Sequence, residues 1–110
     1  MTYWETIHTT EKEGFNLELS ITHEELHPRD CFDDSVEDIS EICRKIDSGA
    51  LYWFTARMRA FKHDIELGSD YLGACLYDNL KEFIDDAYCE DLAYNAVKEA
   101  KENLKILRGE

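Results

Sequence analysis

The chain has 110 residues, which is enough for one domain with a two-layer core and too few for two. Its apolar fraction of 44% is typical of globular proteins and excludes an intrinsically disordered chain. The formal net charge of −13, from 25 acidic and 12 basic residues, argues against direct binding to nucleic acid or to an anionic membrane.

The sequence also indicates a compartment. No apolar run approaches the roughly 20 residues of a membrane span, and the first residues lack the basic and then apolar pattern of a signal peptide. We therefore expect a cytoplasmic protein. The cysteines are widely spaced with no C-x-x-C pair, so we expect reduced and mostly buried thiols at Cys31, Cys43, Cys75 and Cys89.

The first predicted element is a β-hairpin formed by residues 3–9 and 14–22 around a loop at 11–14. Apolar and polar residues alternate along its second strand, which is the period of a strand with one buried face. The predicted buried side chains are Phe15, Leu17, Leu19 and Ile21. Residues 23–33 break this period and contain the only proline, so we expect an irregular connection with at most one helical turn.

A helix is predicted to begin at Asp34 and to end at Ser48 and Gly49. Asp34 would be its N-cap, and Glu37 three positions later would complete a capping box. Apolar residues then recur at the helical period and form one buried stripe. The members of this stripe are Val36, Ile39, Ile42, Cys43 and Ile46.

Residues 50–77 are the most β-like stretch and are predicted to form the central hairpin, with alternate residues from Tyr52 to Ala60 facing the core. A two-residue loop at Lys62 and His63 would place Met58 opposite Leu67, although a longer loop is an alternative because this pair suits a type I′ turn poorly. A β-bulge is predicted at Gly68. After it, the inward side chains would be Leu72, Ala74 and Leu76.

Two helices are predicted to complete the chain. Asn79 caps a short helix with Glu82 as the partner in a capping box, a break follows at 85–87, and the last helix extends from about Tyr88 to Leu107. Its predicted buried residues are Leu92, Ala93, Ala96, Val97, Ala100, Leu104 and Leu107. The order ββαββαα predicts a single α+β domain over residues 1–110, with a four-stranded antiparallel sheet and the helices packed on one face.

The segment from His23 to His27 matches H-E-x-x-H, in which two histidines bind zinc and the glutamate acts as a general base. That chemistry requires a stable helix, whereas Pro28 follows at once, and Glu25 can also cap a single turn that begins after Thr22. A metal hydrolase is therefore a secondary hypothesis. We predict no enzyme, no catalytic residue, no cofactor and no metal ligand, and no family signature surrounds a nucleophile pair of Cys31 and His27.

Acidic residues gather in two groups that can interact with a partner. The first group surrounds the start of the first helix and consists of Asp30, Asp33, Asp34, Glu37, Asp38 and Glu41. The second surrounds the junction of the last two helices and consists of Asp78, Glu82, Asp85, Asp86, Glu90 and Asp91. Carboxylates at i and i+4 on a helix stand about 6 Å apart, close to the spacing of phosphates along a nucleic-acid strand. The alternative is a solvated helix face with acids near positive helix ends.

Several motifs between Tyr52 and Lys101 are similar to one known family. They are the strand WFTARMRAF, the segment ELGSDYLGACLY, the pattern F-x-x-D-A-Y from Phe83 to Tyr88, and the final AVKEAKENL. Together they resemble small uncharacterised proteins that are encoded by phages, prophages and mobile elements, over about half of the chain. The resemblance implies an accessory protein of a mobile element, a class that includes anti-CRISPR and anti-restriction proteins that mimic nucleic acid.

The first functional hypothesis is a non-enzymatic inhibitor whose acidic groups occupy the basic, nucleic-acid-binding surface of a host defence protein. An alternative is an immunity or antitoxin-like protein that neutralises a basic toxin. Both hypotheses involve a basic protein partner, and neither involves a membrane or direct contact with nucleic acid. The sequence does not decide between a monomer and a homodimer, and it identifies neither the target nor the strand order.

Overall fold

A computed structural model of the chain describes residues 3–32 and 38–109. Its elements are β1 (Glu5–Lys12), β2 (Phe15–His23), the 3-10 helix η1 (Pro28–Asp30), α1 (Ile39–Ser48), β3 (Tyr52–Lys62), β4 (Ile65–Tyr77), α2 (Leu80–Ile84) and α3 (Ala87–Arg108). The predicted order ββαββαα and the α+β class are confirmed. The short helix η1 is the single turn that the first connection allows.

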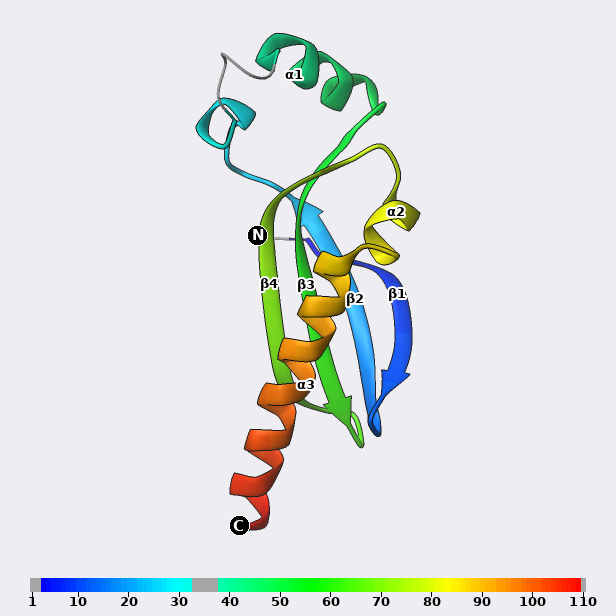
Figure 1. Cartoon of the computed structure of the whole chain (residues 1–110), viewed down its shortest axis with the longest axis vertical. Helices are drawn as coiled ribbons and strands as arrows, with labels where there is room; N and C mark the ends of the chain where they lie inside the picture. The colour runs from blue at the N-terminus through cyan, green and yellow to red at the C-terminus, as the bar shows by residue number, and fades with distance from the viewer. Residues whose placement is uncertain (1–2, 33–37, 110) are drawn as a thin grey trace.

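The four strands form one antiparallel sheet in the order β1-β2-β3-β4, so each strand pairs with its neighbour in the sequence. Helix α3 lies along one face of this sheet, mainly over β3 and β4, with α2 at one end of α3 (Figure 1). We call the covered face the inner face and the opposite face the outer face. Helix α1 lies beyond the end of the sheet beside η1, and not on the inner face (Figure 1).

Helix α1 lies beyond the end of the sheet because its apolar stripe is buried there and not on the inner face. Ile39 and Ile42 are buried, and so is Trp53 at the start of β3, but all three lie outside the main core. The indole N–H of Trp53 donates a hydrogen bond of 2.8 Å to the carbonyl oxygen of Leu26, which ties β3 to the connection that carries η1. A small apolar cluster at the end of the sheet therefore replaces the predicted packing of this helix on the sheet face.

Helix α1 begins four residues later than predicted. Its N-cap is Asp38, whose side chain accepts a hydrogen bond of 3.1 Å from the backbone N–H of Glu41. The predicted cap at Asp34 and its partner Glu37 lie outside the described residues. The predicted end is confirmed, because Gly49 adopts a left-handed φ of 85° and closes the helix.

The first hairpin has a two-residue turn at Glu13 and Gly14, which both have positive φ (53° and 85°). The predicted loop at 11–14 was too long, because β1 continues to Lys12, which pairs with Phe15. The predicted alternation in β2 is confirmed. Its inward side chains reach the core as predicted, fully at Phe15, Leu17 and Leu19 and partly at Ile21.

The predicted loop of the central hairpin was wrong. The turn is formed by His63 and Asp64, which both have positive φ (52° and 65°), and Lys62 is the last paired residue of β3. A type I′ turn needs positive φ at both central positions, and Asp tolerates this region better than Lys does. The turn therefore lies one residue later than predicted, and the register of the whole hairpin changes.

Two bulges in β4 determine the final register. The first shifts the pairing after Ala60 and leaves Leu67 without a partner in β3, next to the predicted bulge residue Gly68. Met58 consequently pairs with Asp70 and not with Leu67, although Met58 and Leu67 are both buried.

The second bulge was not predicted. The pairing with β3 skips Gly73 and Ala74, and Ala74 has a φ of 55°. This insertion reverses the inward parity of the strand, because side chains alternate between the two faces of a sheet. Cys75 and Tyr77 therefore reach the core, in place of the predicted Ala74 and Leu76.

Helix α3 packs so closely on β4 that no side chain fits at Gly68. A Cβ atom added at Gly68 would lie 2.1 Å from the carbonyl oxygen of Ala96 and 2.6 Å from the backbone nitrogen of Ala100. Both alanines are fully buried. One turn later, the side-chain amide of Asn103 donates a hydrogen bond of 2.6 Å to the carbonyl oxygen of Leu67. Small residues therefore allow the helix backbone to touch the strand backbone.

The break between the last two helices is confirmed. Asn79 accepts from the N–H of Glu82 and caps α2, and Asp86 accepts from the N–H of Tyr88 and caps α3. The molecule is elongated, at 53 × 29 × 22 Å, and α3 extends past the sheet at its C-terminal end (Figure 1). For this reason Leu107, predicted to be buried, is exposed. Among the described residues, no helix is both long and apolar enough to cross a membrane.

We predict that Gly68→Ala destabilises the fold by about 3 kcal/mol, because its new methyl group forces α3 away from β4. The control is Gly49→Ala, where no atom lies within 4 Å of the added Cβ and only the left-handed φ is strained; its expected cost is about 1 kcal/mol. Urea denaturation measures both. A Gly68→Ala variant as stable as Gly49→Ala would contradict the close packing of α3.

Candidate binding surfaces

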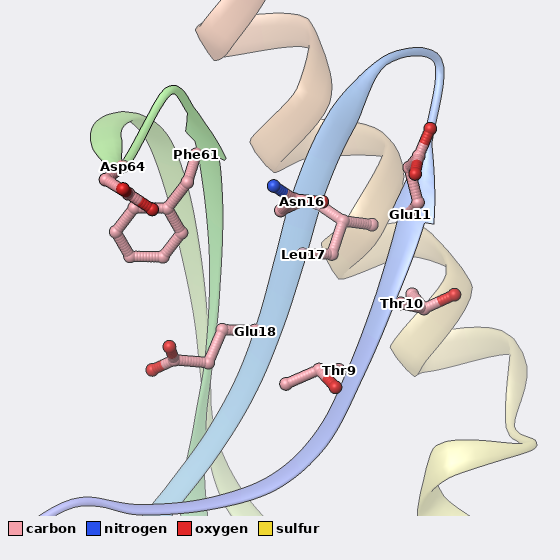
Figure 2. A pocket seen from close by; sticks show the side chains of 8 residues that line it. All are labelled: Thr9, Thr10, Glu11, Asn16, Leu17, Glu18, Phe61 and Asp64. Carbon is pink, nitrogen blue, oxygen red and sulfur yellow. The ribbon is translucent and has the colours of Figure 1, made fainter.

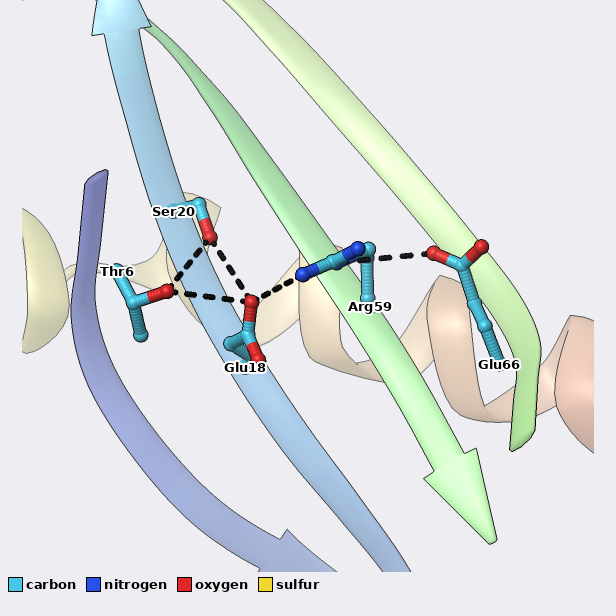
Figure 3. Close-up of polar contacts among 5 residues, drawn as sticks. All are labelled: Thr6, Glu18, Ser20, Arg59 and Glu66. Atoms are coloured by element: carbon cyan, nitrogen blue, oxygen red, sulfur yellow. Dashed lines mark hydrogen bonds and ion pairs between the residues drawn. The ribbon is translucent and has the colours of Figure 1, made fainter. Parts of the chain in front are cut away.

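Glu18 and Arg59 lie at the centre of the outer face of the sheet (Figure 3). Arg59 forms an ion pair with Glu18, and its Nε lies 3.7 Å from a carboxylate oxygen of Glu66. The hydroxyls of Thr6 and Ser20 donate to Glu18 at 3.2 and 3.4 Å. Because these residues come from β1, β2, β3 and β4, the network links all four strands.

This environment favours the ionised form of Glu18. The hydrogen bond from Arg59 is the main cause that lowers the pKa of this carboxyl, and burial opposes it. Glu18 therefore contributes stability at a pH above its ordinary pKa. That contribution is lost as the pH falls through the lowered value in the folded state.

Trp4 lies across the outer face, although it precedes the edge strand β1. The guanidinium carbon of Arg57 on β3 is 4.2 Å from the centre of the indole ring, which is a cation–π distance. The ring of Tyr71 on β4 packs edge-on against the same indole, at 6.1 Å between centroids. The segment before β1 therefore covers part of the outer face and screens Arg57 from solvent.

An open groove of about 560 Å³ lies on the outer face beside the two hairpin turns (Figure 2). We call it the outer-face groove. Its lining combines hydroxyl, amide and carboxylate groups with one aromatic ring, from Thr9, Thr10, Glu11, Asn16, Glu18, Asp64 and Phe61. The carboxylates disfavour an anion, so this groove suits a neutral or cationic group.

The first predicted acidic group is only partly described. Asp30 lies in η1, and Asp38 is the N-cap of α1, so neither forms a row along a helix face. Glu41 forms an ion pair with Arg44, which neutralises its charge locally and lowers the pKa of its carboxyl. The predicted members Asp33, Asp34 and Glu37 lie outside the described residues.

The second predicted acidic group surrounds the junction of α2 and α3, and we call it the acidic ridge. Its members are Asp78, Glu82, Asp85, Asp86, Glu90 and Asp91. All are exposed except Asp86, which is half-buried. The i, i+4 row of Glu82, Asp86 and Glu90 is interrupted, because α2 ends at Ile84 and α3 begins at Ala87. The ridge is therefore a patch on two helices and not a straight row on one.

The charges of the ridge act on neighbouring groups. Burial raises the pKa of the Cys89 thiol to about 11, and the charges of Asp86, Asp85 and Glu90 add to this effect. The Tyr77 hydroxyl donates a hydrogen bond of 3.1 Å to Asp86. Burial and this contact raise the pKa of Tyr77 to about 12. Within residues 3–32 and 38–109, no ion pair involves a carboxylate of the ridge.

The H-E-x-x-H segment does not form a helix. His23 ends β2, and His27 is the N-cap of η1, where its Nδ1 accepts from the N–H of Arg29. The carboxylate of Glu24 is buried and accepts hydrogen bonds from the N–H groups of Glu25 (3.0 Å) and Ala74 (2.6 Å). Glu24 therefore stabilises the second bulge of β4.

The cysteines are all free thiols. The predicted burial holds for Cys75 and Cys89, whereas Cys43 is half-buried and Cys31 is exposed. The neighbour of His27 is Cys43 on α1, with 3.8 Å between Nε2 and Sγ, and not the Cys31 considered from the sequence. Among the described residues, no group of three or more His, Cys, Asp and Glu side chains is arranged to hold a metal ion.

Sequence reasoning missed a second groove, which we call the β4–α3 groove. It encloses about 390 Å³ and is lined by residues 72–77 of β4 together with Phe32 and Tyr88. The acids Asp78, Asp85 and Asp86 adjoin these residues in the sequence. In the sequence, the only sign of this groove was the run of apolar residues after Gly68. Because the second bulge was not predicted, the sequence could not show which of these residues are exposed.

In comparisons with known proteins, no family model matches the chain, and no curated protein or solved structure matches it either. The function is therefore inferred from the residues, their geometry and the resemblance described in the sequence analysis.

We predict that Glu18→Gln lowers the free energy of unfolding by about 1 kcal/mol at neutral pH, because the ion pair with Arg59 is lost. The difference from the parent protein should shrink as the pH falls and should vanish at an acidic pH below the lowered pKa of the folded state, where the parent Glu18 is itself protonated. Urea denaturation at both pH values measures this effect. Glu11→Gln on the same face is the control and should change little, and an equal deficit at both pH values would contradict the assignment.

Proposed function

We propose that the chain is a non-enzymatic interaction protein that binds the positively charged, nucleic-acid-binding surface of another protein through the acidic ridge. One observation supports this most strongly. The ridge concentrates exposed carboxylates that no ion pair neutralises among the described residues. By contrast, Glu13, Glu18 and Glu41 elsewhere are paired with Lys101, Arg59 and Arg44.

Surfaces that bind phosphates hold clustered Lys and Arg side chains, so they attract a dense patch of carboxylates. The net charge of −13 adds a long-range attraction that steers such an encounter and makes it sensitive to salt. Occupation of that surface by the ridge would exclude nucleic acid. Since the ridge spans two helices, recognition would depend on a charged patch rather than on the regular spacing of one helical row.

The resemblance to proteins of phages and mobile elements supports a host defence enzyme as the target, such as a restriction endonuclease or a CRISPR effector. In this proposal the protein is an inhibitor that competes with DNA. The immunity-protein alternative also requires a basic partner. It predicts neutralisation of a toxin rather than displacement of DNA, so the experiment below distinguishes the two.

We predict that the chain displaces a labelled DNA duplex from such an enzyme, as measured by fluorescence anisotropy. Replacing three ridge acids, through Glu82→Gln, Glu90→Gln and Asp91→Asn, should raise the concentration for half displacement about tenfold or more. Asp86 is left intact because it caps α3. Added salt should weaken displacement steeply.

The matched control removes the same formal charge at other exposed positions, through Glu5→Gln, Glu99→Gln and Glu102→Gln. It should displace DNA almost as well as the parent protein. Equal losses in both triple variants would show that only the overall charge matters. The proposal would be refuted if the parent protein displaced DNA at low salt from none of a set of restriction endonucleases and CRISPR effectors.

A further inference from the structure

The β4–α3 groove combines an apolar floor with an acidic rim. Tyr88 is 58% exposed, and Leu76 is partly exposed and is not among the residues packed against the main core. Asp78 directly follows the strand that lines the groove, and Asp91 lies one turn after Tyr88 on α3. Apolar side chains are therefore presented to solvent next to the acidic ridge, although neither is needed to bury the core.

We infer that this groove binds an extended, basic segment of the partner, with an apolar side chain of that segment between Leu76 and Tyr88. The Lys and Arg side chains of the segment would contact the ridge. The inference rests on the proposed function and adds the chemistry of the recognised segment. Charge complementarity selects a basic occupant, and it disfavours a second copy of this chain, which carries a net charge of −13.

An extended conformation follows from the position of β4. It is an edge strand of the sheet, so among the described residues no strand pairs with the side of β4 that lies away from β3. Edge strands can bind an added strand through backbone hydrogen bonds, while the side chains of that strand enter adjacent pockets. In β4 these hydrogen bonds would form on either side of the bulge at Gly73 and Ala74, where the regular pairing is interrupted. The exposed backbone at Gly73 lies within the groove and would allow a peptide to approach closely.

The floor of the groove is held in place before any ligand binds. Ala74 donates its N–H to the buried Glu24, and a Cβ atom at Gly73 would lie only 3.0 Å from the same carboxylate oxygen. Outside the groove, the amide of Asn95 on α3 donates to Asp70 on β4 at 2.9 Å and ties the helix that carries Tyr88 to the strand. Because the strand floor and helix α3 are held in place, little backbone conformational entropy is lost there on binding.

Two synthetic peptides test the inference. One alternates arginine with leucine, and its twin carries serine in place of every leucine. We expect the leucine peptide to bind the parent protein at least about tenfold more tightly, since burial of leucine side chains adds to the charge attraction. The variant Leu76→Ser with Tyr88→Ser should lose about tenfold in affinity for the leucine peptide and keep its affinity for the serine peptide, as measured by fluorescence anisotropy.

Tyr94→Ser is the matched control, because Tyr94 is 60% exposed on the same helix and does not line the groove. It should bind both peptides as the parent protein does. Thermal denaturation verifies that the variants are folded. Equal affinity of the parent for both peptides, no binding of either peptide, or an equal loss in the Tyr94 variant would overturn the inference.

The outcomes separate this inference from the proposed function. If the ridge variant loses DNA displacement while the two peptides bind equally, the function stands and the groove is not a specificity pocket. If the leucine peptide binds through Leu76 and Tyr88 while no enzyme releases DNA, the groove recognises a basic segment of another kind of partner, and the proposed function is wrong.

Discussion

The contact of α3 with β4 at Gly68 is the constraint on which the other features of this fold depend. A side chain at this position would overlap the helix backbone at Ala96 and Ala100. Helices and strands normally pack further apart, because side chains lie between them. Glycine has no side chain, so the long helix α3 can lie directly on the edge strand β4. Helix α3 therefore covers most of the inner face of β3 and β4, and Phe83 of α2 closes one end of it against Phe54 and Tyr77.

This packing determines where the charges lie. With α3 anchored at Gly68 and tied to Leu67 by Asn103, its first turn projects to the end of the sheet that carries α2 (Figure 1). The acids that favour the positive end of a helix are therefore collected at the junction of two helices. The same geometry leaves the second half of β4 uncovered beside Tyr88. The acidic ridge and the β4–α3 groove are thus two consequences of one packing contact.

The sequence predicted features that depend on local patterns. The alternation in β2, the caps at Asn79 and Gly49 and the helix break before α3 all follow from neighbouring residues. The register of the central hairpin could not be predicted, because its turn uses positive φ at His63 and Asp64 without glycine. The second bulge depends on Glu24, about fifty positions away in the sequence, so no local pattern signals it. The acidic ridge was found from composition, whereas the groove beside it required the fold.

The most direct test of this account is a map of backbone amide chemical shifts in the labelled protein as an arginine-rich peptide is added. If the groove and the ridge bind the peptide, the largest changes will occur at residues 72–78 and 82–91, which carry them. The outer-face groove is the internal control for this experiment, because it also presents carboxylates beside an aromatic ring and could bind the same peptide. Largest changes at Asn16, Glu18 and Phe61 would contradict the account and identify the outer face as the binding surface.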